Sequence, residues 1–169
     1  MNKAGKPPGP DGGQVPPPIP GLHAPQQAQQ IQIATRSVPV TSKGNGDMLD
    51  LTPEVTRLLN SIGMHDGQVI LFVPGSTASL TTIEFEHGLK QDFPAAFDRI
   101  MPRDIPYEHD KTWHDGNGHS HVRASTVGPS LTVPFTQGRL TLGTWQQIVL
   151  VDWDNRQRTR DVVIQFWGV

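Results

Sequence analysis

The residues of this chain best suited to chemistry lie in one stretch, residues 109–129. Four of the seven histidines fall there, among carboxylates, an amide and one guanidinium. Imidazoles and carboxylates this close together serve to bind a divalent metal ion or to direct chemistry at a phosphate. The polar side chains concerned are His109, Asp110, His114, Asp115, Asn117, His119, His121 and Arg123. This stretch is therefore the first candidate for a functional site.

The spacing of His119 and His121 leaves two arrangements open. On a strand, residues two apart face the same side, whereas on a helix they diverge by about 200°. A short helix is predicted over residues 120–127, which puts His119 before the helix and His121 in its first turn. Because free N–H groups at a helix N-terminus suit an anion, we expect His121 and Arg123 to bind a phosphate or a metal-bound phosphate there.

Four residues of the stretch are predicted metal ligands: His109, His119, His121 and Asp115. Zn²⁺ favours imidazole nitrogen and Mg²⁺ favours carboxylate oxygen, and the sequence has no fixed zinc spacing such as HExxH. The predicted cofactor is therefore a divalent metal ion, with Zn²⁺ and Mg²⁺ both open. The alternative reading is that these are polar loop residues making turn hydrogen bonds.

Two acidic residues in the middle of the chain, Glu84 and Glu86, form a second candidate. Because they are two residues apart, both would face the same side of a strand and raise one another's pKa, which suits acid–base work. If only one faces inward, the other is a solvated surface charge.

Hydroxyl groups at predicted turns and strand starts are candidates for holding a phosphate or an oxyanion. They belong to Ser76, Thr77, Ser130 and Thr144. The Gly75-Ser76-Thr77 segment is not a Walker loop, since no GK[ST] sequence follows it. A plain turn that ends a strand explains it equally well.

Hydrophobic periodicity predicts the elements that position these residues. A helix is expected over Thr52–Ile62, capped by Thr52 and ended by Gly63. A second helix is expected between Gly88 and Met101, interrupted at Pro94. Residues 69–73 read as a strand buried on both faces. Further strands are predicted over residues 31–40, 76–83, 131–135, 139–142, 144–153 and 158–167.

About seven or eight strands and two or three helices, with the strands gathered late in the chain, indicate an α+β fold. Residues 30–169 are predicted to form one domain. Residues 1–29 are rich in proline and glutamine, and we expect a disordered tail there. The last two strands are long and aromatic, so oligomerisation is expected to cover them.

Composition excludes several classes of protein. A net charge of −2 and the lack of a basic stripe argue against a nucleic-acid partner. The absence of cysteine excludes disulfides and thiolate chemistry. The apolar runs are far shorter than the roughly 20 residues that span a bilayer, and no signal peptide is evident, so no membrane partner and a cytoplasmic location are expected.

Several ordered motifs together resemble the YjbQ family, an uncharacterised protein family also described as secondary thiamine-phosphate synthase. They are VPGSTASLTTIE at residues 73–84, YEH at 107–109, GNGHSHVRAS at 116–125, GPSLTVP at 128–134 and GTWQQI at 143–148. The resemblance covers residues 30–168. It implies a curled antiparallel sheet and a homotrimer with sites near the subunit boundaries.

The resemblance also implies the chemistry. Glu84 and His121 match the family's acidic and histidine positions, and His109 is a third match, so Glu84 and His121 are the predicted catalytic residues, with Arg123 assisting and Glu84 the inward-facing acid. We expect Glu84 and His121 to converge in one pocket. One departure is Pro74-Gly75, where many members carry a histidine.

The implied reaction joins a pyrimidine diphosphate to a thiazole phosphate and releases pyrophosphate. It makes a small phosphorylated metabolite the expected partner, and it requires a cation or an arginine to neutralise the leaving diphosphate. The alternative is a non-catalytic, trimeric protein that binds a metal or a phosphometabolite.

Overall fold

The computed structural model describes residues 30–169, so the tail predicted for residues 1–29 lies outside the described residues. Within the described residues the chain forms eight strands and four helices. In order they are β1 (Gln32–Ser42), β2 (Asp47–Asp50), α1 (Thr52–Ile62), β3 (Gly67–Phe72), β4 (Ala78–Ile83), α2 (His87–Ile100), α3 (Glu108–Trp113), α4 (Gly118–Val127), β5 (Ser130–Thr136), β6 (Arg139–Leu140), β7 (Gln147–Asp152) and β8 (Arg158–Gly168).

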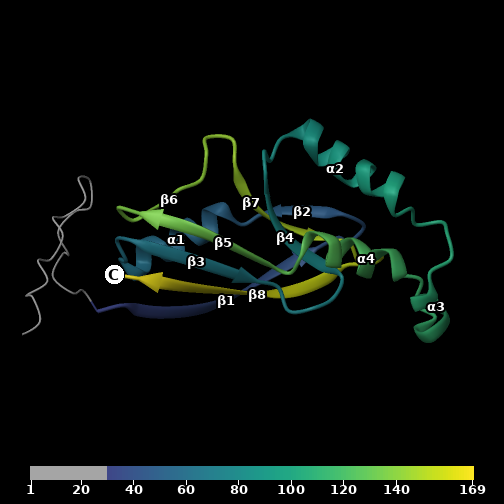
Figure 1. The fold of residues 1–169 in the computed structure, drawn as a ribbon, viewed down its shortest axis with the longest axis horizontal. Helices are drawn as coiled ribbons and strands as arrows, with labels where there is room; N and C mark the ends of the chain where they lie inside the picture. Colours follow the sequence, from purple (N-terminus) through teal and green to yellow (C-terminus); the bar gives the residue numbers. More distant parts are fainter. Residues whose placement is uncertain (1–29) are drawn as a thin grey trace, which may run out of the picture.

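The strands form two antiparallel sheets, which Figure 1 shows as two layers. The larger has the order β1-β8-β3-β5-β6 and the smaller the order β2-β7-β4. Strands β1 and β8 pair along their whole length, from Gln32 opposite Gly168 to Ser42 opposite Arg158. The predicted α+β class with a curled antiparallel sheet is confirmed, although the described residues contain four helices rather than two or three.

Helix α1 has the predicted bounds, but its first residue plays a different part. Pro53 occupies the first turn and Gly63 ends the helix with φ +76°, a conformation that glycine adopts without steric cost. The Thr52 hydroxyl does not cap the helix. It accepts a hydrogen bond from the Ile148 N–H at 2.8 Å, which ties the start of α1 to β7.

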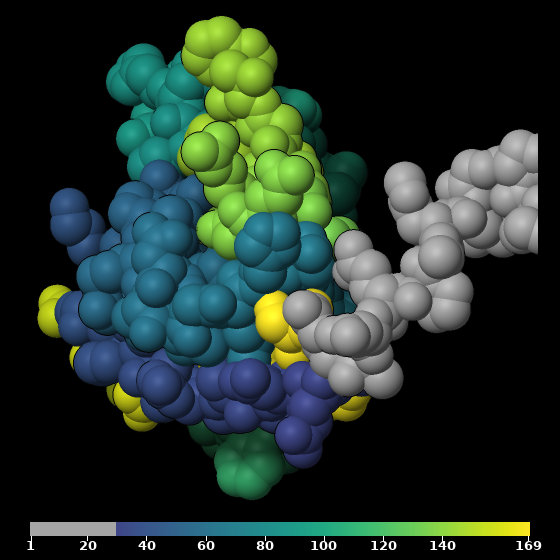
Figure 2. Space-filling view, turned by 90° about the vertical axis from the view of Figure 1, so that its left-hand side faces the viewer, coloured from purple at the N-terminus to yellow at the C-terminus, as the bar shows by residue number. Residues whose placement is uncertain are grey.

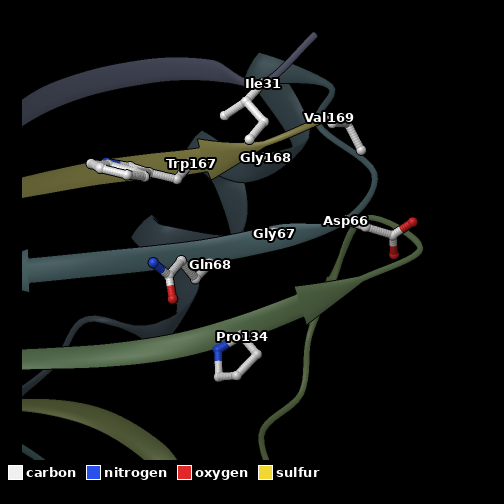
Figure 3. A pocket seen from close by; sticks show the side chains of 8 residues that line it. All are labelled: Ile31, Asp66, Gly67, Gln68, Pro134, Trp167, Gly168 and Val169. Carbon is white, nitrogen blue, oxygen red and sulfur yellow. The ribbon is translucent and has the colours of Figure 1, made fainter. Parts of the chain in front are cut away.

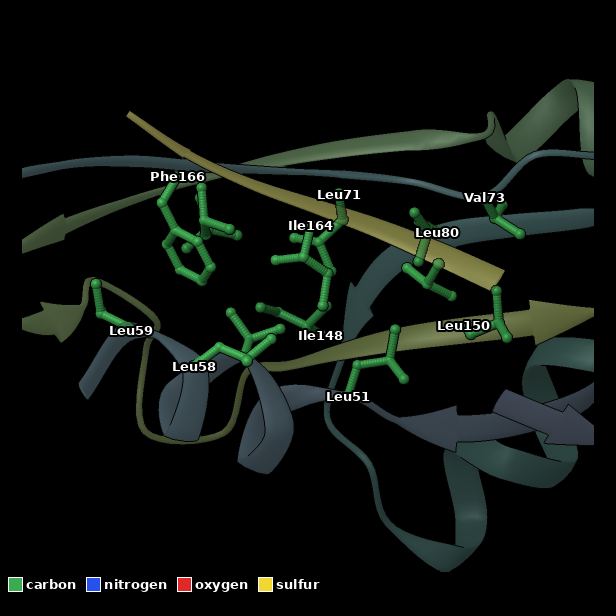
Figure 4. Close-up of a cluster of buried hydrophobic side chains, with 14 of the residues drawn as sticks. Leu51, Leu58, Leu59, Leu71, Val73, Leu80, Ile148, Leu150, Ile164 and Phe166 are labelled. Atoms are coloured by element: carbon green, nitrogen blue, oxygen red, sulfur yellow. The ribbon is translucent and has the colours of Figure 1, made fainter. Parts of the chain in front are cut away.

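The main hydrophobic core lies between the two sheets and α1 (Figure 4). Helix α1 contributes Val55, Leu58 and Leu59, the three residues that its apolar periodicity places on one face. Burying a side chain of this size contributes about 1.5–3 kcal/mol relative to leaving it exposed. The sheets contribute Val69, Leu71, Leu80, Ile148, Leu150, Ile164 and Phe166.

A second cluster covers the other face of the smaller sheet, between α2 and α4. Its centre is Trp153, whose ring centroid lies 4.7 Å from that of Phe97 in α2. The indole N–H donates to Ser79 Oγ at 2.9 Å, and the Trp153 carbonyl accepts from Ser120 Oγ in α4 at 2.6 Å. Trp153 therefore fixes the N-terminal turn of α4, where the histidines lie.

Helix α2 runs unbroken through Pro94, so the predicted interruption is wrong. Proline removes one helical hydrogen bond, but both ends of this helix are held. Glu86 caps the N-terminus by accepting from the N–H groups of Gly88 and Leu89, and Phe97 packs against Trp153. These contacts outweigh the local cost of the proline.

The outer face of the larger sheet is open, which corrects the prediction of a strand buried on both faces. Along β3, Val69 and Leu71 are buried, whereas Phe72 is 43% exposed. Trp167 and its cross-strand partner Ile33 are also exposed on this sheet. In Figure 2, β1 lies in the lower part of the view, and the loop between β6 and β7 projects at the top, as it does in Figure 1.

A shallow cavity of about 370 Å³ lies at the C-terminal end of β8 (Figure 3). It is lined by Ile31, Asp66, Gly67, Gln68, Pro134, Trp167, Gly168 and Val169. None of the residues predicted to do chemistry lines it. Within the described part of the chain, no helix is long and apolar enough to cross a membrane.

Candidate functional site

The histidine stretch folds into two helices, α3 and α4, which contact each other closely where the chain passes from one to the other. Helix α3 ends at His114, whose φ of +56° turns the chain back. Asp110 Oδ1 then accepts the Gly118 N–H at 2.9 Å. A Cβ at Gly118 would lie against the Tyr107 side chain, with Tyr107 Cγ 2.9 Å away, so only glycine allows this approach. The junction brings α3 and the first turn of α4 side by side.

This junction places His109 of α3 against His121 of α4. Their ring centroids are 4.0 Å apart, with the planes inclined by 38°. His109 Nε2 lies 3.8 Å from Asp115 Oδ1. The amide of Asn117, oriented so that both its ends are satisfied, donates to Asp115 Oδ1 at 3.0 Å and to His121 Nε2 at 3.3 Å. The four residues form one cluster, the paired-histidine cluster.

The environment of His121 favours its neutral form. Burial lowers the pKa of His121, and the neighbouring His109 lowers it further. The charges of Asp115 and Asp154 oppose this shift without reversing it. Because Asn117 donates to Nε2, the proton of the neutral ring lies on Nδ1. His121 therefore favours the neutral imidazole form, and within residues 30–169 its Nδ1 proton has no hydrogen-bond partner.

His119 does not belong to the paired-histidine cluster. It is 4% exposed, its Nε2 lies 3.2 Å from Ser120 Oγ, and its ring packs near Tyr107. Burial, together with the charge of Arg123, lowers the pKa of His119. The structure thus separates His119 from the other predicted metal ligands.

The other three predicted metal ligands have atoms that suit a divalent cation, but their arrangement does not. His109, His121 and Asp115 supply two imidazoles and one carboxylate, a set used by borderline divalent ions. Within residues 30–169, however, no group of three or more histidine or acidic side chains converges on a point where it could hold a metal ion.

Arg123 is a structural residue in this chain, which corrects its predicted contact with a phosphate. Its guanidinium is 1% exposed and donates to the Met101 carbonyl and, at 2.7 Å, to Asp98 Oδ1. It also lies over the Trp153 ring, 5.7 Å from the centroid. These contacts attach α4 to the end of α2.

Three N–H groups in the first turn of α4 are already bonded within the chain, which argues against the anion site predicted there. The Gly118 N–H is taken by Asp110, and the N–H groups of Ser120 and His121 are bonded to the Asn117 carbonyl. The helix itself begins at Gly118, two residues earlier than predicted.

Glu84 lies at the far end of β4 from the histidines. Thr77 lies just before β4 and is hydrogen-bonded to Trp153 and Asp154, so this end of the strand lies next to α4. Glu84 is exposed and directly follows the last residue of the 6-residue strand, at its other end. Such a strand spans about 20 Å. The predicted convergence of Glu84 with His121 is therefore not formed within one chain. Glu86 serves as the cap of α2.

A buried ionic network next to the cluster was missed by the sequence analysis. Asp152 pairs with Arg160 through two hydrogen bonds, each of 2.8 Å, and Asp154 accepts from Arg158 Nε and Thr77 Oγ1, each at 2.9 Å. Burial opposes ionisation of Asp154, but the bonds from Thr77 and Arg158 prevail and lower its pKa. The alternation of two acids and two arginines around one turn is a signal that was available in the sequence.

The four residues whose hydroxyl groups were predicted to hold a phosphate do not gather at one site. Thr77 is buried and holds Asp154 and Arg160, so its hydroxyl is already used. Ser76 is exposed beside α4, at a cavity described below. Ser130 begins β5 opposite Phe72, and Thr144 lies in the loop before β7; both are exposed and apart from the histidines.

The two curled antiparallel sheets and the histidine-bearing helix define a class of small α+β protein with a polar site at one edge of the smaller sheet. Residues 36–169 match the family described as UPF0047 protein YjbQ-like. The chain belongs to this family, which confirms the resemblance seen in its motifs.

Three relatives show how far the likeness extends. The Bacillus subtilis UPF0047 protein YugU is 33% identical over 79% of this chain and 98% of its own length. The crystal structure of a YbjQ-like protein of unknown function from Sulfolobus solfataricus P2 matches with a TM-score of 0.78 and 26% identity, covering 83% of this chain and 100% of that one. A hypothetical protein from Aeropyrum pernix K1 matches with a TM-score of 0.74 and 31% identity, covering 80% and 99%.

Proposed function

We propose that this chain is a transferase acting on small phosphorylated substrates, with an activity like that of secondary thiamine-phosphate synthase. The observation that supports this best is the contact between the His109 and His121 rings, whose centroids are 4.0 Å apart. Two imidazoles held this close, next to Asp115 and Asn117, and only partly buried, could act together on a bound substrate.

In the proposed reaction a nitrogen of the thiazole phosphate attacks the methylene carbon of the pyrimidine diphosphate. The new N–C bond forms as the C–O bond to the diphosphate breaks, and the electron pair leaves with pyrophosphate. No proton need be removed. His121, neutral and carrying its proton on Nδ1, donates a hydrogen bond to the leaving oxygen, where negative charge develops. Asn117 and Asp115 hold the ring in that orientation.

A second candidate is a non-catalytic protein that binds a divalent metal or a phosphometabolite. It is favoured by the position of Glu84, which stands apart from the histidines in the single chain. Here His109, His121 and Asp115 act as ligands, with Zn²⁺ favoured by the imidazoles and Mg²⁺ by the carboxylate. Further ligands would come from the bound metabolite.

The purified full chain, with Zn²⁺ or Mg²⁺ added, separates the two candidates. It is supplied with both substrates while pyrophosphate release and the joined product are measured. We expect His121→Ala to lower turnover by about 100-fold or more, the usual scale for losing a group that assists a leaving atom. His87→Ala, at an exposed histidine, is the matched control. Tight metal or phosphate binding by calorimetry without product selects the second candidate.

We also propose that the protein acts as a homotrimer in the cytoplasm. The open outer face of the larger sheet, with Phe72, Trp167 and Ile33 exposed, supports association, because monomers seldom expose large apolar patches. A trimer could also bring Glu84 of one copy toward the histidines of another. Light scattering at micromolar concentration tests it: a monomer mass at all concentrations rejects the proposal.

A further inference from the structure

A small cavity lies between the loop that joins β3 to β4 and helix α4. Its volume is about 210 Å³, and Gly75, Ser76, Ala78, Ala124, Ser125 and Pro129 line it. Pockets that enclose a whole small molecule are usually about 300–1,000 Å³. This cavity is therefore of a size to take one group of a substrate, with the remainder outside.

The loop side of the cavity presents unused hydrogen-bond donors. None of the hydrogen bonds formed within residues 30–169 uses the N–H groups of Gly75 or Ser76. Ser76 is an exposed residue that lines the cavity. Gly75 has φ +137°, which an L side chain rarely adopts. Successive free N–H groups in such a turn form a concavity that suits an anion.

A nearly buried guanidinium stands behind the same loop. The Arg160 side chain is 10% exposed, and its Nε and Nη2 are held by Asp152 and Thr77. Its Nη1 makes no hydrogen bond within the described residues. A Cβ on Gly75 would lie 3.3 Å from this atom, so glycine leaves the guanidinium edge open to the loop. Arg158 and Arg160 together balance the charges of Asp152 and Asp154.

Helix α4 contributes to both the cavity and the proposed chemical centre. Ser125 lines the cavity and lies one helical turn after His121, and its hydroxyl donates to the His121 carbonyl at 2.8 Å. Residues four apart share a helix face. A group bound in the cavity is thus one helical turn from the imidazole pair.

We infer that this cavity is a phosphoryl-binding subsite, formed by the Gly75 and Ser76 N–H groups and the Ser76 hydroxyl, with the positive charge of Arg160 directly behind Gly75. The inference rests on the proposed function, for which it names the place where a substrate phosphate is held. The anion is either the diphosphate of one substrate or the single phosphate of the other, and both present the same acceptor oxygens. Arg160 is a binding residue that orients the substrate toward His121.

Calorimetry on the full chain with inorganic phosphate and with pyrophosphate, at fixed ionic strength, tests the inference. Ser76→Asp puts a carboxylate at the cavity on an exposed loop, so it should repel the anion without disturbing the core. We expect it to weaken binding at least tenfold. Ser61→Asp, at an exposed serine on α1, adds the same charge elsewhere and should change binding less than twofold.

Unchanged affinity in Ser76→Asp, or no binding of either anion by the wild-type protein, would overturn the subsite. Pyrophosphate binding tenfold tighter than phosphate assigns the subsite to the diphosphate, and equal affinities assign it to the single phosphate. The two proposals fail separately. If Ser76→Asp abolishes anion binding but the wild-type protein shows no turnover, the subsite stands and the transferase proposal is rejected. If the wild-type protein turns over and Ser76→Asp does not change the rate, the transferase proposal stands and the subsite is rejected.

Discussion

His109 and His121 meet ring to ring across the junction of α3 and α4, with their centroids 4.0 Å apart. Two imidazoles in such contact cannot both carry a proton without electrostatic cost, since like charges at short range disfavour the charged form. The contact therefore couples the protonation of the site to its geometry. It also depends on one glycine, Gly118, which lets the two helices approach.

The titration of His121 is the most direct measure of this coupling. Burial and then His109 lower the pKa of His121, so in metal-free protein its ring should titrate below the ordinary value of about 6.5. In His109→Gln, one of the causes is removed, and the midpoint should rise. Proton NMR of the ring resonances across pH 4–8 measures both. A midpoint that is the same in the two proteins contradicts the coupling.

The same shifts fix how stability responds to pH. His119 and His121 both have folded pKa values below the unfolded value. The unfolded chain then binds more protons as the pH falls below about 6.5, so stability is full above that value and is lost as the pH drops toward the folded pKa values. Urea unfolding of His119→Asn against wild type should show a shallower loss over this window. Equal slopes for the two proteins would count against the shifted pKa of His119.

Elements with a clear period were predictable, and short ones were not. Helix α1 shows its apolar stripe over three turns, and Pro53 and Gly63 mark its ends, so its bounds agree with the structure. Strand β2 has 4 residues and helix α3 has 6, too few to show a period, and both were missed. Phe72 looked buried because exposure on an open sheet face leaves no local signal.

The parts of the site that come from one short stretch were predictable, and the contacts with distant residues were not. The paired-histidine cluster was partly predictable because His109, Asp115 and His121 lie within one short stretch of the chain. The position of the cluster relative to residues far away in the sequence was not predictable. Glu84 was expected beside His121, but the direction of β4 carries it to the opposite end. Arg160 of β8 in the larger sheet meets Asp152 of β7 in the smaller sheet and Thr77 just before β4, an arrangement that the sequence does not display.

Replacing Gly118 should separate the paired histidines. A Cβ at this position would collide with Tyr107, so Gly118→Ala must shift α3 or α4. We expect a loss of about 1–3 kcal/mol, the range for forcing extra volume into a packed contact, and a His121 pKa nearer its ordinary value. Gly143→Ala is the control, because its nearest atoms are side-chain atoms of Gln146 at 3.8 Å or more. Equal stability of the two variants would show that the junction is not tight.

The ionic network below the site, besides the role proposed for Arg160 in binding, should contribute to stability. Arg160→Met leaves Asp152, which is fully buried, without its cation. Removing one partner of a buried pair costs about 3–5 kcal/mol, because the remaining charge is uncompensated. Arg139→Met, at an exposed arginine, should change stability by less than about 0.5 kcal/mol. Urea unfolding measures both, and a loss below 1 kcal/mol for Arg160→Met would mean that water reaches Asp152.

Binding of a divalent metal ion should depend on His109 and His121 but not on His119. His109, His121 and Asp115 lie together, whereas His119 is buried against Ser120 and Tyr107. If the protein binds Zn²⁺ through the cluster, His109→Gln and His121→Gln each remove one ligand and should weaken binding more than tenfold, since zinc sites depend on their full ligand set. His119→Gln should leave the affinity within twofold. Calorimetric titration of chelator-treated protein gives all three values. A loss of affinity in His119→Gln equal to that in His121→Gln would move the metal away from the cluster and toward the buried side of α4.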